Sequence, residues 1–521
     1  MIAAWSTDLI AQQPAVRTVT VGDLAEVAAE LAAYQAHFAP LFRRREQRVW
    51  GELYLRGLLV ADVPRKNSEA LALRLLGAGA DAEGTVRAVQ QFLGAGGWDD
   101  AALLAVHQRL VDETLGADDG VLIIDGSDVP KQGDHSVGVA RQWCGHTGKQ
   151  DNCQAGVYLG YASAKGYTLL DRRLYLPACW FTPAYAERWH TCGIPRGTPF
   201  RTKHDLAEAL VAELRASGRV RARWVVCDEG FGDSPALLDR WGKTGLHYLA
   251  EVARDTQVWP LTNADGTTPR AEPTTWVPPQ TPSKKGPAPV RVRLHPASPP
   301  KQRVDEWAVQ VPAARWQRYR LLEGSKGPLI AAFVAVPIVT VRRRLPGPPG
   351  WLLVRRSVPS DPTEQPTYKY YLSNAPAATP LATLVWVSGM RWPIEACFTA
   401  TRQEVGFDHY ETRSWRGWHH HLTLVLLAHH FLVRLQQRLD PREGGLPTSP
   451  RPATHADTPA GPAAHPGPHH PKRGAGPPTL ACLPPVATAV AAPGHRAHRL
   501  PSTPETRRLP GPAPQSAPPP C

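Results

Sequence analysis

Three charged residues in the C-terminal part of the sequence have a spacing that could do chemistry. Arg391 and Glu395 are four residues apart, and Arg402 follows Glu395 by seven. On an α-helix, which has about 3.6 residues per turn, these intervals place all three side chains on one face. Pro393 is expected to restart the helix at this point. A carboxylate between two guanidinium groups suits a site that holds a metal ion and a phosphate together, although an exposed face of salt bridges is the plainer interpretation.

Two aspartates could supply the partners that Glu395 would need to bind metal. The apolar run 121–124 leads directly into Asp125, and the run 223–227 leads into Asp228. Each run is typical of a buried strand that delivers a carboxylate at its end and then turns. For a single aspartate a turn cap is the commoner role, but the pattern occurs twice. Three converging carboxylates can hold two divalent cations about 4 Å apart. Mg²⁺ prefers such oxygen ligands, and Mn²⁺ is the expected substitute.

The segments around the aspartates predict an α/β fold. Strand-like runs and helical patterns alternate here, which indicates a mixed sheet flanked by helices. The expected strands are 121–125, 154–162, 167–176, 223–228 and 246–252, and the expected helices are 203–217 and 234–241. We therefore predict that residues 118–254 form the first part of a catalytic core.

The remaining segments differ from this core in their residue patterns and composition. Residues 17–117 have helical periodicity and predict a helical domain, in which Arg43, Arg44, Arg45 and Arg48 could bind DNA phosphates or form a solvated face. Residues 255–371 predict a β-rich insertion, in which 307–311 is one expected strand. Residues 372–439 predict helices that complete the core. Residues 440–521 are rich in Pro and contain no Phe, Trp or Tyr, so we expect a disordered tail.

The composition indicates a polyanionic partner. The chain has 59 Lys and Arg residues against 46 Asp and Glu residues, a formal net charge of +13, and nucleic acid is the usual partner of such a surface. No secretory signal pattern and no run of about 18 apolar residues is present, so we expect a cytoplasmic protein without a membrane partner. The cysteines form no CxxC pair, which argues against a zinc site.

The motifs taken together resemble those of DDE transposases from bacterial insertion sequences. One group of these enzymes carries its third acidic residue in a helical Tyr-x2-Arg-x3-Glu-x6-Lys signature. Arg391 and Glu395 match this signature, whereas Arg402 stands at the Lys position and Ser388 at the Tyr position. The resemblance covers roughly residues 40–437, and its clearest segments are 124–133, 136–144, 148–154, 228–233 and 406–413.

This resemblance implies a ribonuclease H-like core with the insertion placed before its last catalytic helix. It also implies a metal-binding triad of Asp125, Asp228 and Glu395, with Arg391 and Arg402 beside it. Asp128 is a rival for the first position and Asp233 for the second; we prefer Asp125 because it directly follows the apolar run. Further candidates for DNA contacts near the cleavage site are Lys131, Arg141 and Lys149.

The function that the resemblance implies is DNA transposition. Such an enzyme binds the terminal inverted repeats of its element on double-stranded DNA, cleaves strands to free 3′-hydroxyls and joins them to target DNA. It would work as a homodimer near the bacterial nucleoid. Two alternatives stay open: a catalytically inactive or repurposed DNA-binding protein derived from a transposase, and a metal-dependent nuclease that hydrolyses DNA without strand transfer.

Overall fold

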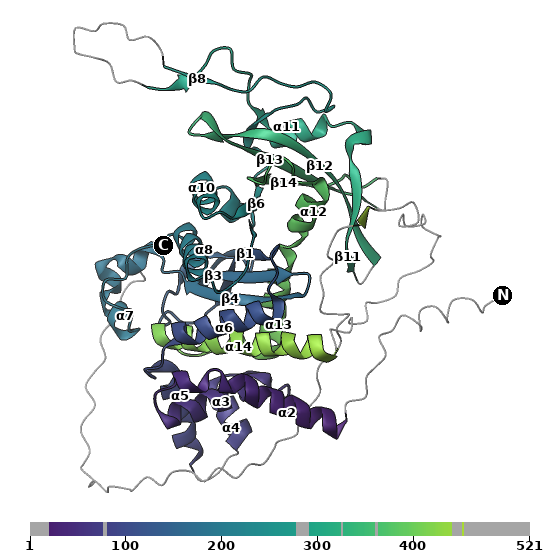
Figure 1. Ribbon diagram of the computed structural model, residues 1–521. Coiled ribbons are helices and arrows are strands. Elements are labelled where there is room, and N and C mark those ends of the chain that lie inside the picture. Colours follow the sequence, from purple (N-terminus) through teal and green to yellow (C-terminus); the bar gives the residue numbers. More distant parts are fainter. Residues whose placement is uncertain are drawn as a thin grey trace, which may run out of the picture.

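A large mixed sheet flanked by helices forms the centre of the computed structural model (Figure 1). The structure describes residues 20–76, 81–277, 291–324, 327–359, 363–439 and 451–452. The expected mixed α/β class is therefore confirmed. The strands of the main sheet are β1 (Val121–Pro130), β2 (Ala140–Cys144), β3 (Lys149–Ser163), β4 (Gly166–Leu174), β5 (Trp224–Cys227), β6 (His247–Val252), β7 (Gln257–Pro260), β10 (Gln302–Arg303), β11 (Gln317–Gly324), β12 (Gly327–Arg342), β13 (Leu345–Ser357), β14 (Tyr368–Ser373) and β15 (Arg451–Pro452).

The order of the strands places a parallel core between antiparallel flanks. Strands β1, β5 and β6 run parallel, and they join β3 on one side and β14 on the other through antiparallel pairs. Beyond β14 the order continues with β13, β12, β7 and β10. The strands of the segment 255–371 therefore extend the central sheet.

Helices cover both faces of the sheet, and the alternation of strand residues separates two apolar cores. Ile123 belongs to the core on the side of α13 and α14, and Ile124 belongs to the core on the side of α8 and α10. The N-terminal helices pack beyond α14 (Figure 1). The helices are α2 (Val21–Ala36), α3 (Arg45–Leu59), α4 (Ser68–Leu76), α5 (Ala82–Gly94), α6 (Asp100–Leu115), α7 (Ala186–Thr191), α8 (Lys203–Ser217), α9 (Glu229–Gly232), α10 (Pro235–Lys243), α11 (Val304–Val309), α12 (Leu381–Gly389), α13 (Trp392–Val405) and α14 (Trp415–Leu439).

Helix α13 begins and ends where its sequence requires. Pro393 lies in the first turn, where its missing N–H costs no hydrogen bond, so the chain restarts here after α12. Gly406 ends the helix with a φ of 67°, in the left-handed region that favours glycine. A Cβ added at Gly406 would also lie 2.8 Å from the Cβ of Lys66. These two signals fix the position of Glu395 in the first turn of the helix.

Two local expectations are wrong. The expected turn after Asp125 is strand, because β1 continues to Pro130 through antiparallel pairing with β3. The expected strand 307–311 lies mostly in helix α11, whose Val304, Trp307 and Ala308 are buried at helical spacing. The expected disordered tail, 440–521, lies outside the described residues apart from β15, which pairs with β11.

In the part of the chain that the structure describes, no helix combines the length and the apolar character that crossing a bilayer requires.

Candidate active site

Three acidic residues form a row across the adjacent parallel strands β1, β5 and β6. Ile124 of β1 pairs with Cys227 of β5, and Cys227 pairs with Ala250 of β6. The next residue of each strand is acidic: Asp125, Asp228 and Glu251. The residues two positions earlier all belong to the core on the α13 side: Ile123, Val226 and Leu249. Because side chains alternate along a strand, the three carboxylates face α13.

The guanidinium of Arg391 joins this row to helix α13. Its Nη2 lies 2.5 Å from Oε1 of Glu395, and its Nη1 lies 3.5 Å from Oδ2 of Asp125. Its Nε lies 3.7 Å from Oε2 of Glu251. Asp228 caps helix α9, where its Oδ1 accepts a hydrogen bond of 3.2 Å from the N–H of Phe231. The structure therefore brings four of the predicted site residues together: Arg391 contacts Asp125 and Glu395, and Asp228 lies close enough to act on Asp125 through its charge.

Asp125 and Asp228 are poorly stabilised as anions. The pKa of Asp125 is raised to about 7, mainly by burial and also by the charge of Asp228, and the charge of Arg391 opposes this rise. Burial also raises the pKa of Asp228, against the hydrogen bond from Phe231 and the charge of Arg391. A site of this kind favours additional positive charge.

Positive charge between the carboxylates comes from Arg391 in this structure. Among the residues that the structure describes, no group of three or more His, Cys, Asp or Glu side chains is arranged to hold a metal ion. The donor chemistry nevertheless fits a divalent cation, because the row and Glu395 offer carboxylate oxygens, and the raised pKa values of Asp125 and Asp228 show that these two anions lack sufficient positive partners.

Arg402 turns away from Glu395 toward strand β1. Its Nη2 lies 2.5 Å from Oγ of the buried Ser127, and its guanidinium lies over the rings of Phe398 and Phe407. Of the three residues predicted to share one helix face, Arg391 therefore lies next to Glu395, whereas Arg402 contacts strand β1. Ser388 is buried in α12, where its hydroxyl donates to the carbonyl of Val385 at 2.7 Å.

The two rival aspartates bind backbone groups. Oδ2 of Asp128 accepts from the N–H of Gly145 at 2.7 Å, and Oδ1 of Asp233 accepts from the N–H of Ala253 at 3.0 Å. Asp128 is three residues from Asp125 on a strand, so the two side chains point to opposite faces of the sheet. Both rivals therefore have structural partners.

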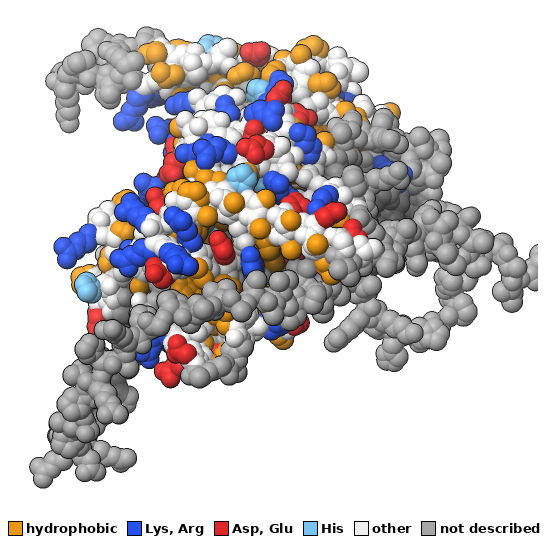
Figure 2. Space-filling view, turned by 60° about the horizontal axis from the view of Figure 1, so that its bottom comes forward, with side chains coloured by type: hydrophobic (Ala, Val, Ile, Leu, Met, Phe, Trp, Pro, Cys, Tyr) orange, Lys and Arg blue, Asp and Glu red, His pale blue; other side chains and the backbone are white. Residues whose placement is uncertain are grey.

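The basic residues predicted to contact DNA differ in their exposure to solvent. Arg43, Arg44, Arg45, Arg48, Arg141 and Lys149 are exposed. Lys131 instead packs inward: its Nζ lies 3.7 Å from the centre of the Tyr410 ring, and burial lowers its pKa to about 8. Figure 2 shows Lys and Arg side chains gathered on one side of the visible face, with hydrophobic side chains between them.

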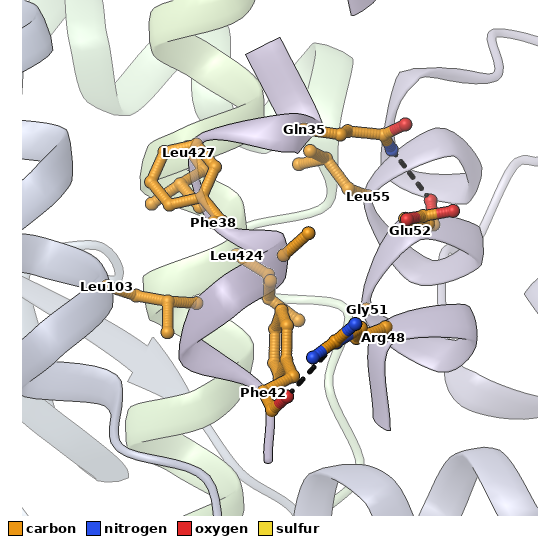
Figure 3. A pocket seen from close by; sticks show the side chains of 11 residues that line it. Gln35, Phe38, Phe42, Arg48, Gly51, Glu52, Leu55, Leu103, Leu424 and Leu427 are labelled. Carbon is orange, nitrogen blue, oxygen red and sulfur yellow. Dashed lines mark hydrogen bonds between the residues drawn. The ribbon is translucent and has the colours of Figure 1, made fainter. Parts of the chain in front are cut away.

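A hollow elsewhere in the molecule lies among the N-terminal helices and α14, and apolar side chains form most of its lining (Figure 3). Nε2 of Gln35 donates to the carbonyl of Glu52 at 3.0 Å, and Nε of Arg48 donates to the carbonyl of Phe42 at 3.2 Å. None of the carboxylates of the row lines this hollow. We therefore place the candidate site at the carboxylate row.

Glu251 is the acidic residue of the site that the sequence analysis missed. Its strand was expected at 246–252, so the same pattern of an apolar run with a carboxylate was present. Val252 follows Glu251 within that strand, so Glu251 did not stand at the end of the apolar run as Asp125 and Asp228 do. The register of β6 against β5 is the signal that identifies it.

Comparison with known proteins agrees with this geometry. A search of curated proteins finds no match. The model of the DDE superfamily endonuclease family matches residues 37–328, which is more than half of the chain. The matched segment contains Asp125 and Asp228 and ends before Arg391 and Glu395. The chain belongs to the DDE superfamily of endonucleases.

Proposed function

We propose that this protein is a DDE transposase with a ribonuclease H-like core, which cleaves DNA at the ends of its element and joins the ends to target DNA. The observation that carries the proposal is the row of Asp125, Asp228 and Glu251 with Arg391 linking it to Glu395. Membership in an endonuclease family supports DNA as the substrate. The insertion-sequence origin rests on the resemblance of the sequence motifs.

Asp125, Asp228 and Glu395 would hold the divalent cations, Mg²⁺ or Mn²⁺. When bound, such a pair of cations would lower the pKa of the attacking water or hydroxyl and stabilise the leaving oxygen. Arg391 lies beside two of these carboxylates, so it could bind the nonbridging oxygens of the scissile phosphate. Asp228 is held by the start of α9, which fixes the direction of its carboxylate.

DNA would also be bound by basic residues outside the carboxylate row. Arg44 and Arg45 lie at the N-terminus of α3, and Arg43 precedes them. Positive side chains there oppose the helix dipole, so an anionic partner would relieve this repulsion. We therefore assign the N-terminal helices, 17–117, to DNA binding, with Arg141 and Lys149 on the β2–β3 pair as a second contact. Two protomers would pair the two ends of the element.

The decisive variant is Glu395→Gln. It keeps the shape of the side chain but removes the charge that would hold a cation, so we expect Mg²⁺-dependent strand cleavage to fall by at least about 100-fold. Binding of DNA that carries the element ends should stay unchanged. The substrate is a duplex ending in the inverted repeats, which must first be identified in the DNA that flanks the coding region. The measurements are gel assays of cleavage and of binding with the same DNA.

Glu404→Gln is the matched control, because it removes the same charge from the other end of the same helix. It should cleave as the wild type does. If Glu395→Gln cleaves DNA normally, the assigned triad is wrong. Joined DNA products would separate a transposase from a nuclease that only hydrolyses. A wild-type protein that binds ends but never cleaves them would favour a repurposed DNA-binding protein.

A further inference from the structure

Glu251 makes contacts that link the carboxylate row to the rest of the sheet. Lys369 of β14 places its Nζ 2.8 Å from Oε1 and 3.1 Å from Oε2 of Glu251. On the other side, Oε2 of Glu251 lies 3.7 Å from Nε of Arg391. The Glu251 side chain is only 13% exposed, whereas that of Lys369 is 43% exposed. Lys369 makes the shorter contact but is screened by water, whereas the Arg391 side chain is only 22% exposed, so its longer contact with Glu251 is less screened.

The three nitrogens of Arg391 are divided among three carboxylates. Nη1 and Nη2 approach Asp125 and Glu395, and Nε approaches Glu251. A guanidinium is planar and rigid, so a carboxylate beside Nε fixes the directions in which Nη1 and Nη2 point. Without Glu251, the side chain of Arg391 would keep two partners but lose the contact that sets its plane.

We propose that Glu251 is a positioning residue of the active site: it anchors Arg391, which in turn holds Asp125 and Glu395 in the arrangement that receives a divalent cation. The anchoring of Arg391 rests on the contacts alone, and the effect on the cation rests on the proposed function. Glu251 acts through Arg391 and is not itself a ligand. With a divalent cation held by Asp125 and Glu395, Glu251 would remain as a negative partner for the guanidinium of Arg391.

A double-mutant cycle tests both parts with purified full-length protein. The variants are Glu251→Gln, Arg391→Gln and the combination of the two. In EDTA, thermal unfolding should show that the two single losses of Tm do not add in the double variant, because the residues interact directly. By titration calorimetry with Mn²⁺, Glu251→Gln should weaken binding about 10-fold, the usual effect of losing an outer partner of a metal site. This weakening should largely disappear in the Arg391→Gln background.

Lys369→Met is the control, because it removes the other partner of Glu251 and leaves the Arg391 contact in place. It should leave Mn²⁺ affinity nearly unchanged. Glu251→Asp provides a second variant should Glu251→Gln fold poorly: it keeps the charge but withdraws it from Arg391, so it should also weaken Mn²⁺ binding.

Each of the remaining outcomes would contradict one part of the proposal. Additive Tm losses would contradict the anchoring of Arg391. A 10-fold loss of Mn²⁺ affinity that persists in the Arg391→Gln background would make Glu251 a direct ligand and overturn its positioning role. Absence of Mn²⁺ binding in the wild type would count against the proposed function, while the cycle in EDTA would still decide whether Glu251 anchors Arg391.

Discussion

At the scale of single residues, the pair of Arg402 and Ser127 couples the helix that carries Glu395 to the strand that carries Asp125. The Ser127 side chain is 6% exposed, and its Oγ accepts a charge-assisted hydrogen bond of 2.5 Å from Arg402. Ser127→Ala leaves this guanidinium without its partner on β1. We expect the free energy of unfolding to fall by about 1.5–3 kcal/mol, measured by urea denaturation. Ser127→Thr keeps the hydroxyl and should lose less; equal stability of Ser127→Ala and wild type would contradict the coupling.

The acidic residues show how far single positions can be predicted from sequence. Asp125, Asp228 and Glu395 could be predicted as site residues because an apolar run or a helical spacing marks each of them, and these signals are local. Glu251 was missed because its role depends on the register between β5 and β6, which pairs residues far apart in the chain. The contact between Arg402 and Ser127 joins residues that are 275 positions apart in the sequence, so no local sequence pattern indicates it.

At the scale of elements, Lys66 joins the C-terminal ends of two helices. Its side chain is buried, and its Nζ donates to the carbonyl of Leu58 in α3 at 2.6 Å and to the carbonyl of Glu404 in α13. A positive charge is favourable at both helix ends. Lys66→Met leaves these carbonyls without their donor, so we expect the free energy of unfolding to fall by about 2–4 kcal/mol in chemical denaturation.

Lys165→Met is the comparison for this prediction. Lys165 also donates to a carbonyl at a helix end, that of Gly116 after α6, but it is exposed to water. The same substitution should therefore cost less there, because water replaces the lost donor. A loss at Lys165 as large as that at Lys66 would mean that burial does not decide the strength of these caps.

Elements were easier to predict than their boundaries. The hairpin of β3 and β4 and helix α8 follow from alternation, from helical periodicity and from Gly218, which ends α8 with a φ of 61°. Strand β1 was predicted too short because Gly, Ser, Asp and Pro within residues 126–130 are typical of a turn, whereas the pairing of this segment with β3 makes it strand. Helix α11 was predicted as strand because its apolar run is too short for periodicity to separate the two.

At the scale of the whole molecule, helix α14 connects the N-terminal helices to the sheet. His420, His421, His429 and His430 of this helix are buried, and they have partners on several elements. The hydroxyl of Tyr54 lies 2.9 Å from Nδ1 of His421, and the hydroxyl of Thr168 lies 3.0 Å from Nδ1 of His429. The sequence showed an apolar helix interrupted by histidines. It could not show that these histidines are paired inside the protein, since their partners are hundreds of residues away.

The buried histidines of α14, together with His107 of α6, should make the fold sensitive to mild acid. Burial lowers the pKa of His107, His420 and His429 to about 4, that of His421 to about 3, and that of His430 well below its usual range. At these positions the unfolded chain therefore binds more protons below pH 6.5, so the stability that the histidines contribute is complete above that pH and is lost as the pH falls toward 4. Asp125, whose pKa is raised, contributes in the opposite direction. Each buried histidine contributes up to about 1.4 kcal/mol per pH unit in this window.

Urea denaturation between pH 7.5 and 5 measures how steeply the free energy of unfolding changes with pH. His421→Gln should reduce it by one such contribution, whereas replacing the exposed His146 by Gln should leave it unchanged. Equal stability of the wild type at pH 7.5 and pH 5 would show that the histidines of α14 are not held neutral by the fold.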